Sequence, residues 1–149
     1  MTEVRFYHLQ RQSQEQVIPS LLGKAHDGGR RVVLVMPDEG AVARMNEHLW
    51  TYAPNSFLPH GSRKDGHVED QPIFLTAQDE NPNGAKVLVV AHGAQSAMHQ
   101  DFDLCCEILD GRDNGAVEAA RGRWKTYKAQ GFDVTYWQQD EQGRWSQKA

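Results

Sequence analysis

Long apolar runs, a leader segment and a disulfide framework are all missing from this sequence of 149 residues. No stretch reaches the ~18 consecutive apolar residues that span a bilayer, so we expect no membrane association. The N-terminal residues lack the basic and apolar regions of a signal peptide, so we expect no secretion. The only cysteines, Cys105 and Cys106, are neighbours, and a disulfide between them would be strained. A reducing compartment is therefore favoured, which predicts a cytoplasmic protein.

Nucleotide-binding motifs are missing too. Phosphate binding requires a glycine-rich turn at the start of a helix, but neither G-x-x-x-x-G-K-[ST] nor G-x-G-x-x-G occurs. Gly28 and Gly29 precede an apolar run, which is the wrong side for a phosphate loop. Asp38 and Glu39 follow an apolar run, where acidic residues typically begin a helix. Nucleotide hydrolysis is not expected, and the sequence predicts no cofactor.

Metal-binding and nucleophilic motifs are equally scarce. Seven histidines are present, yet none forms H-x-x-x-H or pairs with cysteine at zinc spacing, and G-x-S-x-G is absent. We therefore predict neither a metal site nor a catalytic residue. One alternative stays open, an enzyme with a small-molecule site at the carboxyl ends of the strands, near Asp38 and His92-Gly93. A capping or packing role is the competing interpretation of His92.

Acidic residues outnumber lysine and arginine by 20 to 16, and the net charge is −4. This balance argues against charge-driven binding of nucleic acid by the whole surface. Residues 115–131 are the exception, because four cations face a single acid, Glu118, and give a local charge of +3. A basic segment on an acidic protein indicates a specific acidic partner.

Strand-like and helix-like segments alternate along the chain. Apolar runs predict strands at 4–9, 31–36, 72–77, 86–91, 104–109 and 133–138. Helices are predicted at 14–26, 38–50 and 115–130, the first with Ser13 as N-cap and Pro19 as a defect that delays or kinks it. This alternation indicates an α/β fold with a mostly parallel central sheet and helices on both faces. We expect one domain over residues 1–138, an exposed polar loop at 61–70 and a flexible polar tail at 139–149.

The predicted helix at 116–128 combines an apolar side with a stripe of cations. The cations are Arg121, Lys125 and Lys128, and Trp124 lies at the seam between the two sides. One interpretation is an ordinary amphipathic helix with solvated charges. The functional interpretation is an apolar notch beside paired cations, suited to a peptide that ends in a hydrophobic residue and a carboxylate. Arginine offers that carboxylate a planar fork, and the indole offers flat apolar area.

Two more large aromatics, Trp50 and Phe57, lie at the end of the second predicted helix and in the segment after it. Chain at such a position usually runs over the surface. The pair is interpreted either as a lid on the core or as an anchor for another protein.

Several of these segments resemble one protein family, the chi subunit of the bacterial DNA polymerase III holoenzyme, a clamp-loader accessory subunit. The segments that carry the resemblance are, in chain order, Phe6-Tyr7, residues 31–35, Leu49-Trp50, residues 56–60 and residues 120–132. The last of them reads R-x-R-W-K-x-Y-K-x-x-G-F. The resemblance covers nearly the whole chain and implies a Rossmann-like three-layer sandwich without nucleotide chemistry.

The resemblance also implies a function, that of a non-catalytic replication adaptor. Such an adaptor links the acidic C-terminal tail of single-stranded-DNA-binding protein to the polymerase III clamp loader through a second small subunit, psi, and meets DNA only indirectly. Carried over residue by residue, Arg121, Trp124 and Lys125 would hold the final phenylalanine and carboxylate of the tail. Residues expected near them are Lys128, Phe132 and Leu109.

The resemblance assigns the second aromatic surface as well. Trp50 and Phe57 would face psi or a helicase-like protein. One departure from the family pattern is Trp124, which stands where tyrosine is familiar. Direct binding of single-stranded DNA by the basic helix is a further alternative, and the net charge disfavours it.

Overall fold

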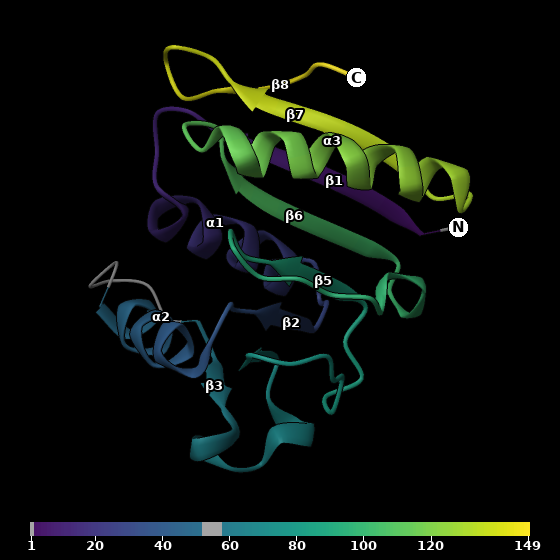
Figure 1. Ribbon diagram of the computed structural model, residues 1–149. Helices are drawn as coiled ribbons and strands as arrows, with labels where there is room; N and C mark the ends of the chain where they lie inside the picture. Colours follow the sequence, from purple (N-terminus) through teal and green to yellow (C-terminus); the bar gives the residue numbers. More distant parts are fainter. Residues whose placement is uncertain (1, 52–57) are drawn as a thin grey trace.

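The computed structural model describes residues 2–51 and 58–149. Within these residues eight strands form one sheet, in the order β3-β4-β2-β5-β6-β1-β7-β8 (Figure 1). The strands are β1 (Glu3–Leu9), β2 (Val32–Val35), β3 (His60–Ser62), β4 (Ile73–Thr76), β5 (Val87–Val90), β6 (Leu104–Asp110), β7 (Asp133–Gln139) and β8 (Trp145–Gln147). Neighbouring strands of the described sheet pair in parallel, except β7 and β8, which pair antiparallel. The predicted α/β fold with a mostly parallel sheet is confirmed.

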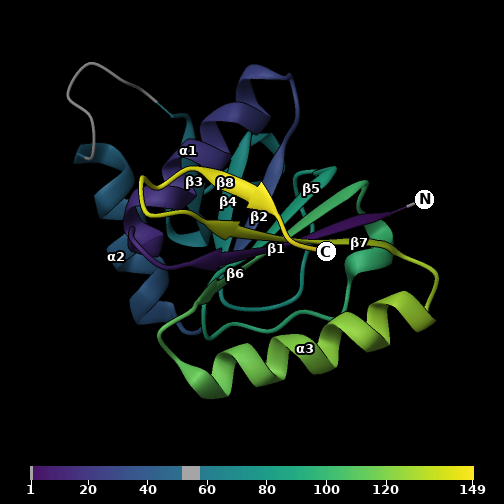
Figure 2. The same ribbon diagram turned by 90° about the horizontal axis from the view of Figure 1, so that it is seen from above.

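Three helices cover the two faces of the described sheet. Helices α1 (Gln14–Asp27) and α2 (Glu39–Thr51) lie on one face and α3 (Asn114–Ala129) lies on the other (Figure 2). The two cysteines illustrate the division, because Cys105 packs into the core under α3 and Cys106 packs into the core on the α1 side. The arrangement agrees with a Rossmann-like sandwich. Among the described residues no helix is both long enough and apolar enough to cross a membrane.

Helix α1 runs without interruption through Pro19. The backbone N–H of Ser13 donates to Gln16 Oε1 (3.0 Å), which places Ser13 at the N-cap as predicted. Proline has no N–H, so it leaves the carbonyl of Glu15, four residues earlier, without its helical donor. That oxygen instead accepts from His48 Nε2 of α2 at 2.7 Å. The proline therefore frees an acceptor that ties the two helices together.

Two segments differ from the expectation. Gly61 and Ser62 end the parallel strand β3, so the prediction of an exposed loop is wrong for these two residues. The rest of the segment at 61–70 contains two short 3-10 turns, Arg63–Asp65 and Val68–Asp70. Gly61 and Ser62 are buried, and Gly61 lies so close to the Gln71 side chain that a Cβ would come within 2.6 Å of it. A larger residue at position 61 would have to displace the Gln71 amide, a constraint that the composition of a polar loop does not reveal.

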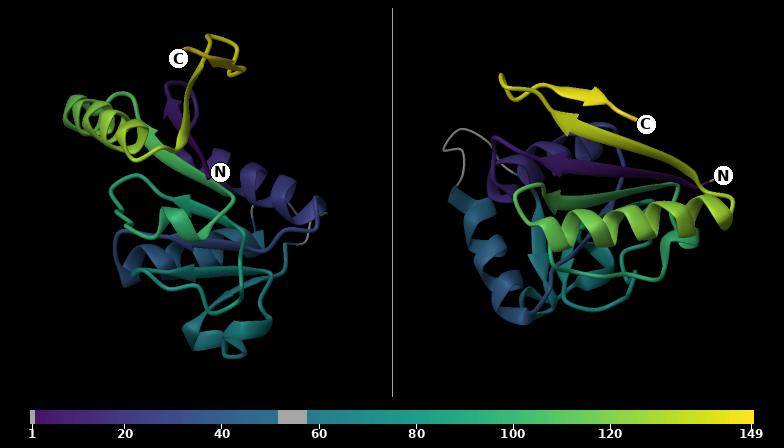
Figure 3. Two further views of the ribbon diagram at one scale, coloured as in Figure 1. Left: turned by 90° about the vertical axis from the view of Figure 1, so that its right-hand side faces the viewer. Right: turned by 45° about the horizontal axis from the view of Figure 1, so that its top comes forward.

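The residues after 138 also differ. Gln139 is 2% exposed and ends β7, and the chain then turns back to form β8 (Figure 3). The turn is closed by the Asp140 N–H, which donates to the Arg144 carbonyl at 2.8 Å. Residues 139–149 are therefore part of the sheet edge in place of the expected tail. The hairpin escapes detection because its second strand is three residues long and has a single apolar side chain, Trp145.

The connection from β6 through α3 to β7 determines where the candidate site lies. Strand β1 pairs with β6 on one side and with β7 on the other, so α3 crosses over β1. Residues of even number in β1 and β7 face α3, as Val4, Phe6 and Val134 do in the core beneath it. His8, Tyr136 and Gln138 continue these rows toward the carboxyl ends of the two strands.

Candidate functional site

Helix α3 has the two sides that the sequence predicts. Asp113 caps its N-terminus by accepting from the Ala116 N–H at 3.1 Å. Ala120 and Tyr127 are buried in the core, whereas Arg121 and Lys125 are exposed. Neither of these two cations forms a hydrogen bond or ion pair through its side chain with the residues that the structure describes. The helix thus presents two unpaired positive charges beside its apolar side.

These two cations share a cavity of about 470 Å³ with Trp124. Its lining comes from three parts of the chain, namely β1, α3 and the C-terminal hairpin: His8, Val117, Arg121, Trp124, Lys125, Tyr136, Gln138 and Ala149. Arg121, Trp124 and Lys125, the three residues that the resemblance assigns to tail binding, thus line one cavity. The contributions of β1 and β7 were not predicted, because the pairing of these two strands cannot be read from periodicity alone.

The floor of the cavity is polar but uncharged. His8 Nδ1 forms a hydrogen bond with the Tyr136 hydroxyl at 2.7 Å. Burial and the nearby charge of Arg121 lower the pKa of His8, against an opposing effect of Asp110. Burial raises the pKa of Tyr136. Both groups are therefore neutral near pH 7, and the positive charge of the site comes from Arg121 and Lys125.

Trp124 is half-buried and forms the aromatic wall of the cavity. Its ring lies 6.4 Å from Phe6 and 6.3 Å from Tyr136, the latter at an angle of 68°. Lys128 Nζ lies 4.7 Å from the centroid of the indole, a cation–π distance. Lys128 thus adds positive charge beside the indole, although it does not line the cavity.

Arg123, the fourth cation of α3, belongs to a buried cluster under the helix. Its Nε donates to Glu107 Oε1 at 2.8 Å, while Glu107 Oε2 accepts from His99 Nε2 at 2.8 Å and from the Tyr127 hydroxyl. Burial acts to raise the pKa of Glu107, but the hydrogen bonds from His99 and Tyr127 and the charge of Arg123 outweigh it, and the net pKa is lowered. Glu107 is ionised at neutral pH and holds α3 on β6.

Two of the residues expected near the site lie away from the cavity. Leu109 is 1% exposed in the core beneath α3, so it supports the helix and does not meet a ligand, which corrects the expectation. Phe132 packs on Tyr127 and His99, with ring centroids 6.0 and 6.4 Å away. It follows the C-terminal end of α3, whereas Arg121 lies at the middle of the helix.

The second predicted surface is described only in part. Trp50 is 57% exposed at the end of α2, and its ring lies 4.7 Å from that of His60. A hollow of about 330 Å³ adjoins it, lined by Trp50, residues 59–60, 65–67 and 70–72. Phe57 lies outside the described residues.

The side chains of the alternative enzyme site accept hydrogen bonds from backbone N–H groups. Asp38 Oδ1 accepts from the Ala41 N–H at 2.7 Å at the start of α2. His92 Nδ1 accepts from the Asp110 N–H at 3.1 Å, and His92 Nε2 lies 3.5 Å from Asp113 Oδ2. Asp38 thus caps α2, and His92 packs against the backbone at the end of β6. No group of three or more metal-ligating side chains occurs within residues 2–51 and 58–149.

Comparison with known proteins gives consistent matches. The family model described as "DNA polymerase III chi subunit, HolC" matches residues 1–135. A probable DNA polymerase III subunit chi of Rickettsia prowazekii is 33% identical over 90 residues, which cover 60% of this chain and 54%, about half, of that protein. The DNA polymerase III subunit chi of Escherichia coli is 24% identical over 80% of this chain and 82% of its own length. That of Pseudomonas aeruginosa is 23% identical, over 90% of this chain and 94% of its own.

Proposed function

The chain belongs to the family of DNA polymerase III chi subunits, replication accessory subunits of a polymerase complex, and on this premise we propose that it is a non-catalytic adaptor in the cytoplasm. Its ligand at α3 is the acidic C-terminal tail of single-stranded-DNA-binding protein. Its link to the clamp loader is a psi-type subunit, and a helicase-like protein is the alternative partner at the same surface.

The observation that carries the proposal is the convergence of Arg121, Lys125 and Trp124 on one cavity. A peptide that ends in phenylalanine presents an aromatic ring and an α-carboxylate a few bonds apart. The ring packs against the exposed sides of Trp124 and Tyr136, and the carboxylate meets the unpaired guanidinium of Arg121. Lys125 and Lys128 then face the aspartates that precede the terminal residue.

Because the cations meet the acidic residues and the aromatic side chains meet the ring, we expect the affinity for the tail to depend strongly on salt concentration. The three cations are exposed, so their attraction to an acidic tail is screened as the ionic strength rises. The ring contact is apolar and is not screened. Salt therefore weakens the binding without abolishing it.

The test is a titration with a fluorescent peptide that carries several aspartates and a terminal phenylalanine. We expect a Kd of about 1 µM, roughly −8 kcal/mol. Removal of the phenylalanine abolishes binding and Arg121→Ala weakens it by about tenfold to a hundredfold. Arg112→Ala retains binding because Arg112 pairs with Asp110 outside the cavity. Equal binding of the truncated peptide would overturn the proposal, and tight binding of a bare oligonucleotide would favour direct DNA recognition.

The contact with the psi-type subunit is proposed at the second surface, at Trp50 and Phe57. The support is the large exposed indole of Trp50 beside a hollow, a common form of protein-binding anchor. Trp50→Ala and Phe57→Ala should each remove psi from a pull-down and leave the tail peptide bound. Loss of both partners together would contradict two separate surfaces.

A further inference from the structure

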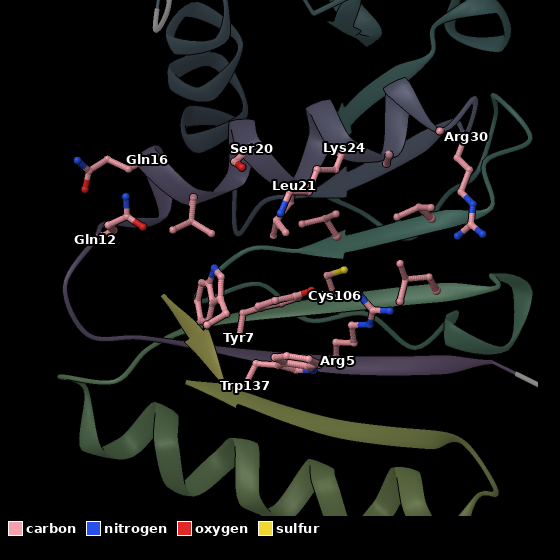
Figure 4. Close-up of a pocket in the computed structure, with 17 residues that line it drawn as sticks. Arg5, Tyr7, Gln12, Gln16, Ser20, Leu21, Lys24, Arg30, Cys106 and Trp137 are labelled. Carbon is pink, nitrogen blue, oxygen red and sulfur yellow. Dashed lines mark hydrogen bonds between the residues drawn. The ribbon is translucent and has the colours of Figure 1, made fainter. Parts of the chain in front are cut away.

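The face of the sheet that carries α1 and α2 is not fully covered by the described helices. Strands β6, β1 and β7 have α3 on one side, while on the other side they border a groove of about 670 Å³ (Figure 4). Parallel strands are normally covered on both faces, because their side chains are apolar on both. Two rows of paired residues run across this face. One is formed by Ile108, Tyr7 and Trp137, and the other by Cys106, Arg5 and Thr135. The groove therefore lies beside α1, at a position in the helical layer that no described helix occupies.

The lining of the groove is apolar in its floor and positive at its rim. Figure 4 shows Ser20 and Lys24 of α1 on one side, Tyr7 and Cys106 on the floor and Trp137 opposite. Trp145 of β8 packs edge-on against Tyr7, with the ring centroids 5.0 Å apart. Burial raises the pKa of the Cys106 thiol to about 12, so the floor carries no thiolate charge.

The charge of the groove is opposite to that of the whole protein. Three cations line it, Arg5, Lys24 and Arg30, and no carboxylate does, although the net charge of the chain is −4. Arg5 is paired with Glu3 at 2.6 Å. Lys24 and Arg30 are exposed and form no ion pair through their side chains with the described residues. Two positive charges thus remain available to an acidic ligand.

The side of α1 that faces the groove has the spacing of a helix-packing surface. Gln16, Ser20, Lys24 and Gly28 follow one another at intervals of four, and Val17, Leu21 and Ala25 form the adjacent row. Such i±4 rows are the ridges that pack into the grooves of a neighbouring helix. Small side chains at positions 20, 25 and 28 allow a close approach.

The two walls of the groove are held at a fixed separation. The side chain of Gln139, in β7, accepts from the backbone N–H groups of Gln10, Arg11 and Gln12 at 3.2 to 3.3 Å. Gln139 Nε2 also donates to Gln12 Oε1 at 2.7 Å. These bonds tie the β7–β8 hairpin to the start of α1. A groove that is already formed binds without the cost of ordering its walls.

We propose that this groove binds an amphipathic helix of a partner protein, with apolar side chains on Tyr7, Leu21 and Trp137 and with acidic residues opposite Lys24 and Arg30. The net charge of −4 and the burial of Tyr7, which leaves little of its ring face for a base to stack on, favour protein over nucleic acid. The surface is separate from the cavity at Arg121, because the two lie on opposite faces of the sheet. The proposal does not depend on tail binding.

The test is a selection in which 14-residue helical segments, the length of α1, are displayed on a helical-hairpin scaffold with a fixed apolar face and random flanks. Helices selected on the purified protein should be enriched in Asp and Glu. Ser20→Trp, which fills the groove, and the double change Lys24→Glu with Arg30→Glu should each weaken the best binder by about tenfold or more. Lys86→Glu is the matched control, because Lys86 is exposed next to the groove residue Val87 but does not line it.

An unchanged circular dichroism spectrum and an unchanged urea midpoint show in each variant that the fold is intact. The proposal is overturned if no helix is selected, if the flanks show no acidic bias, or if the binders tolerate Ser20→Trp. A single-stranded oligothymidylate that binds and is lost in the double charge reversal would assign the groove to nucleic acid and would likewise overturn the proposal.

Discussion

On the inner side of α3, Arg123 donates to a carboxylate that is 5% exposed, whereas Arg121, two residues earlier, has no ion pair within the described part of the chain. Both are arginines of one basic helix, but the helical period puts only Arg121 in the stripe with Lys125 and Lys128. The inner guanidinium is occupied by Glu107, so it contributes to stability and is not available to a ligand. The outer guanidinium faces a cavity, so it is available to a ligand and contributes little to stability.

The largest expected effect tests the inner side of this comparison. Glu107→Ala leaves Arg123, His99 and the Tyr127 hydroxyl without their common acceptor. Breaking a buried pair of this kind costs about 3–5 kcal/mol, which urea denaturation would measure as a lower midpoint with an unchanged slope. Tyr127→Phe removes only one donor and should cost about 1 kcal/mol. If the two variants were equally stable, the cluster would not hold the helix.

The next effect separates the two arginines directly. Arg121→Ala should weaken binding of the tail peptide by about tenfold to a hundredfold, since a hydrogen bond to a charged group contributes about 1.5–3 kcal/mol. Its free energy of unfolding should stay within about 0.5 kcal/mol of wild type. Arg123→Ala should show the reverse pattern and lose about 1–2 kcal/mol of stability, less than a buried pair because its side chain is 35% exposed. A variant that changed both quantities equally would remove the distinction.

A third prediction concerns acid. The pKa of Glu107 is lower in the folded protein than its ordinary value of 4.5. The unfolded chain therefore takes up the proton first, and the stabilisation is complete above the unfolded pKa and is lost as the pH falls through the folded pKa. Urea midpoints measured from neutral pH down to about pH 3 should fall for wild type. Glu107→Gln should flatten that curve in the acid range while leaving the tail peptide bound at neutral pH.

The type of most elements and the composition of the basic helix could be read from the sequence, but β3, β8 and the strand order could not. Periodicity placed Trp124 at the seam of α3, because every α-helix turns by about 100° per residue and the side that each residue faces follows from its number. It could not place His8 beside Tyr136, since that contact depends on β1 pairing with β7 across 128 positions of sequence. The resemblance supplied Leu109 as a neighbour of the site, and only the packing of β6 under α3 showed that it is buried.

The groove on the other face escaped the sequence for the same reason. Its floor takes residues from β1, β5 and β6, and one wall is the β7–β8 hairpin, part of which was expected as a tail. Trp145 lies in a polar segment with no periodic pattern around it. Its position against Tyr7 follows from the turn at Asp140, whose carboxylate accepts from the N–H groups of Gln142 and Arg144 at 2.9 Å.

The smallest expected effect concerns the residue between the two sides of α3. Trp124→Tyr restores the ring that is familiar in the family and shortens the aromatic wall of the cavity. A tyrosine ring keeps the contact with Phe6 and the cation–π position of Lys128, so the affinity for the tail peptide should change less than about fivefold, within about 1 kcal/mol. Trp124→Ala removes both contacts and should lose binding far more strongly. Titrations of the three proteins with the same peptide decide the matter. A loss in Trp124→Tyr as large as in Arg121→Ala would mean that the ligand is matched to the larger ring, and that the wall contributes as much to recognition as the cations do.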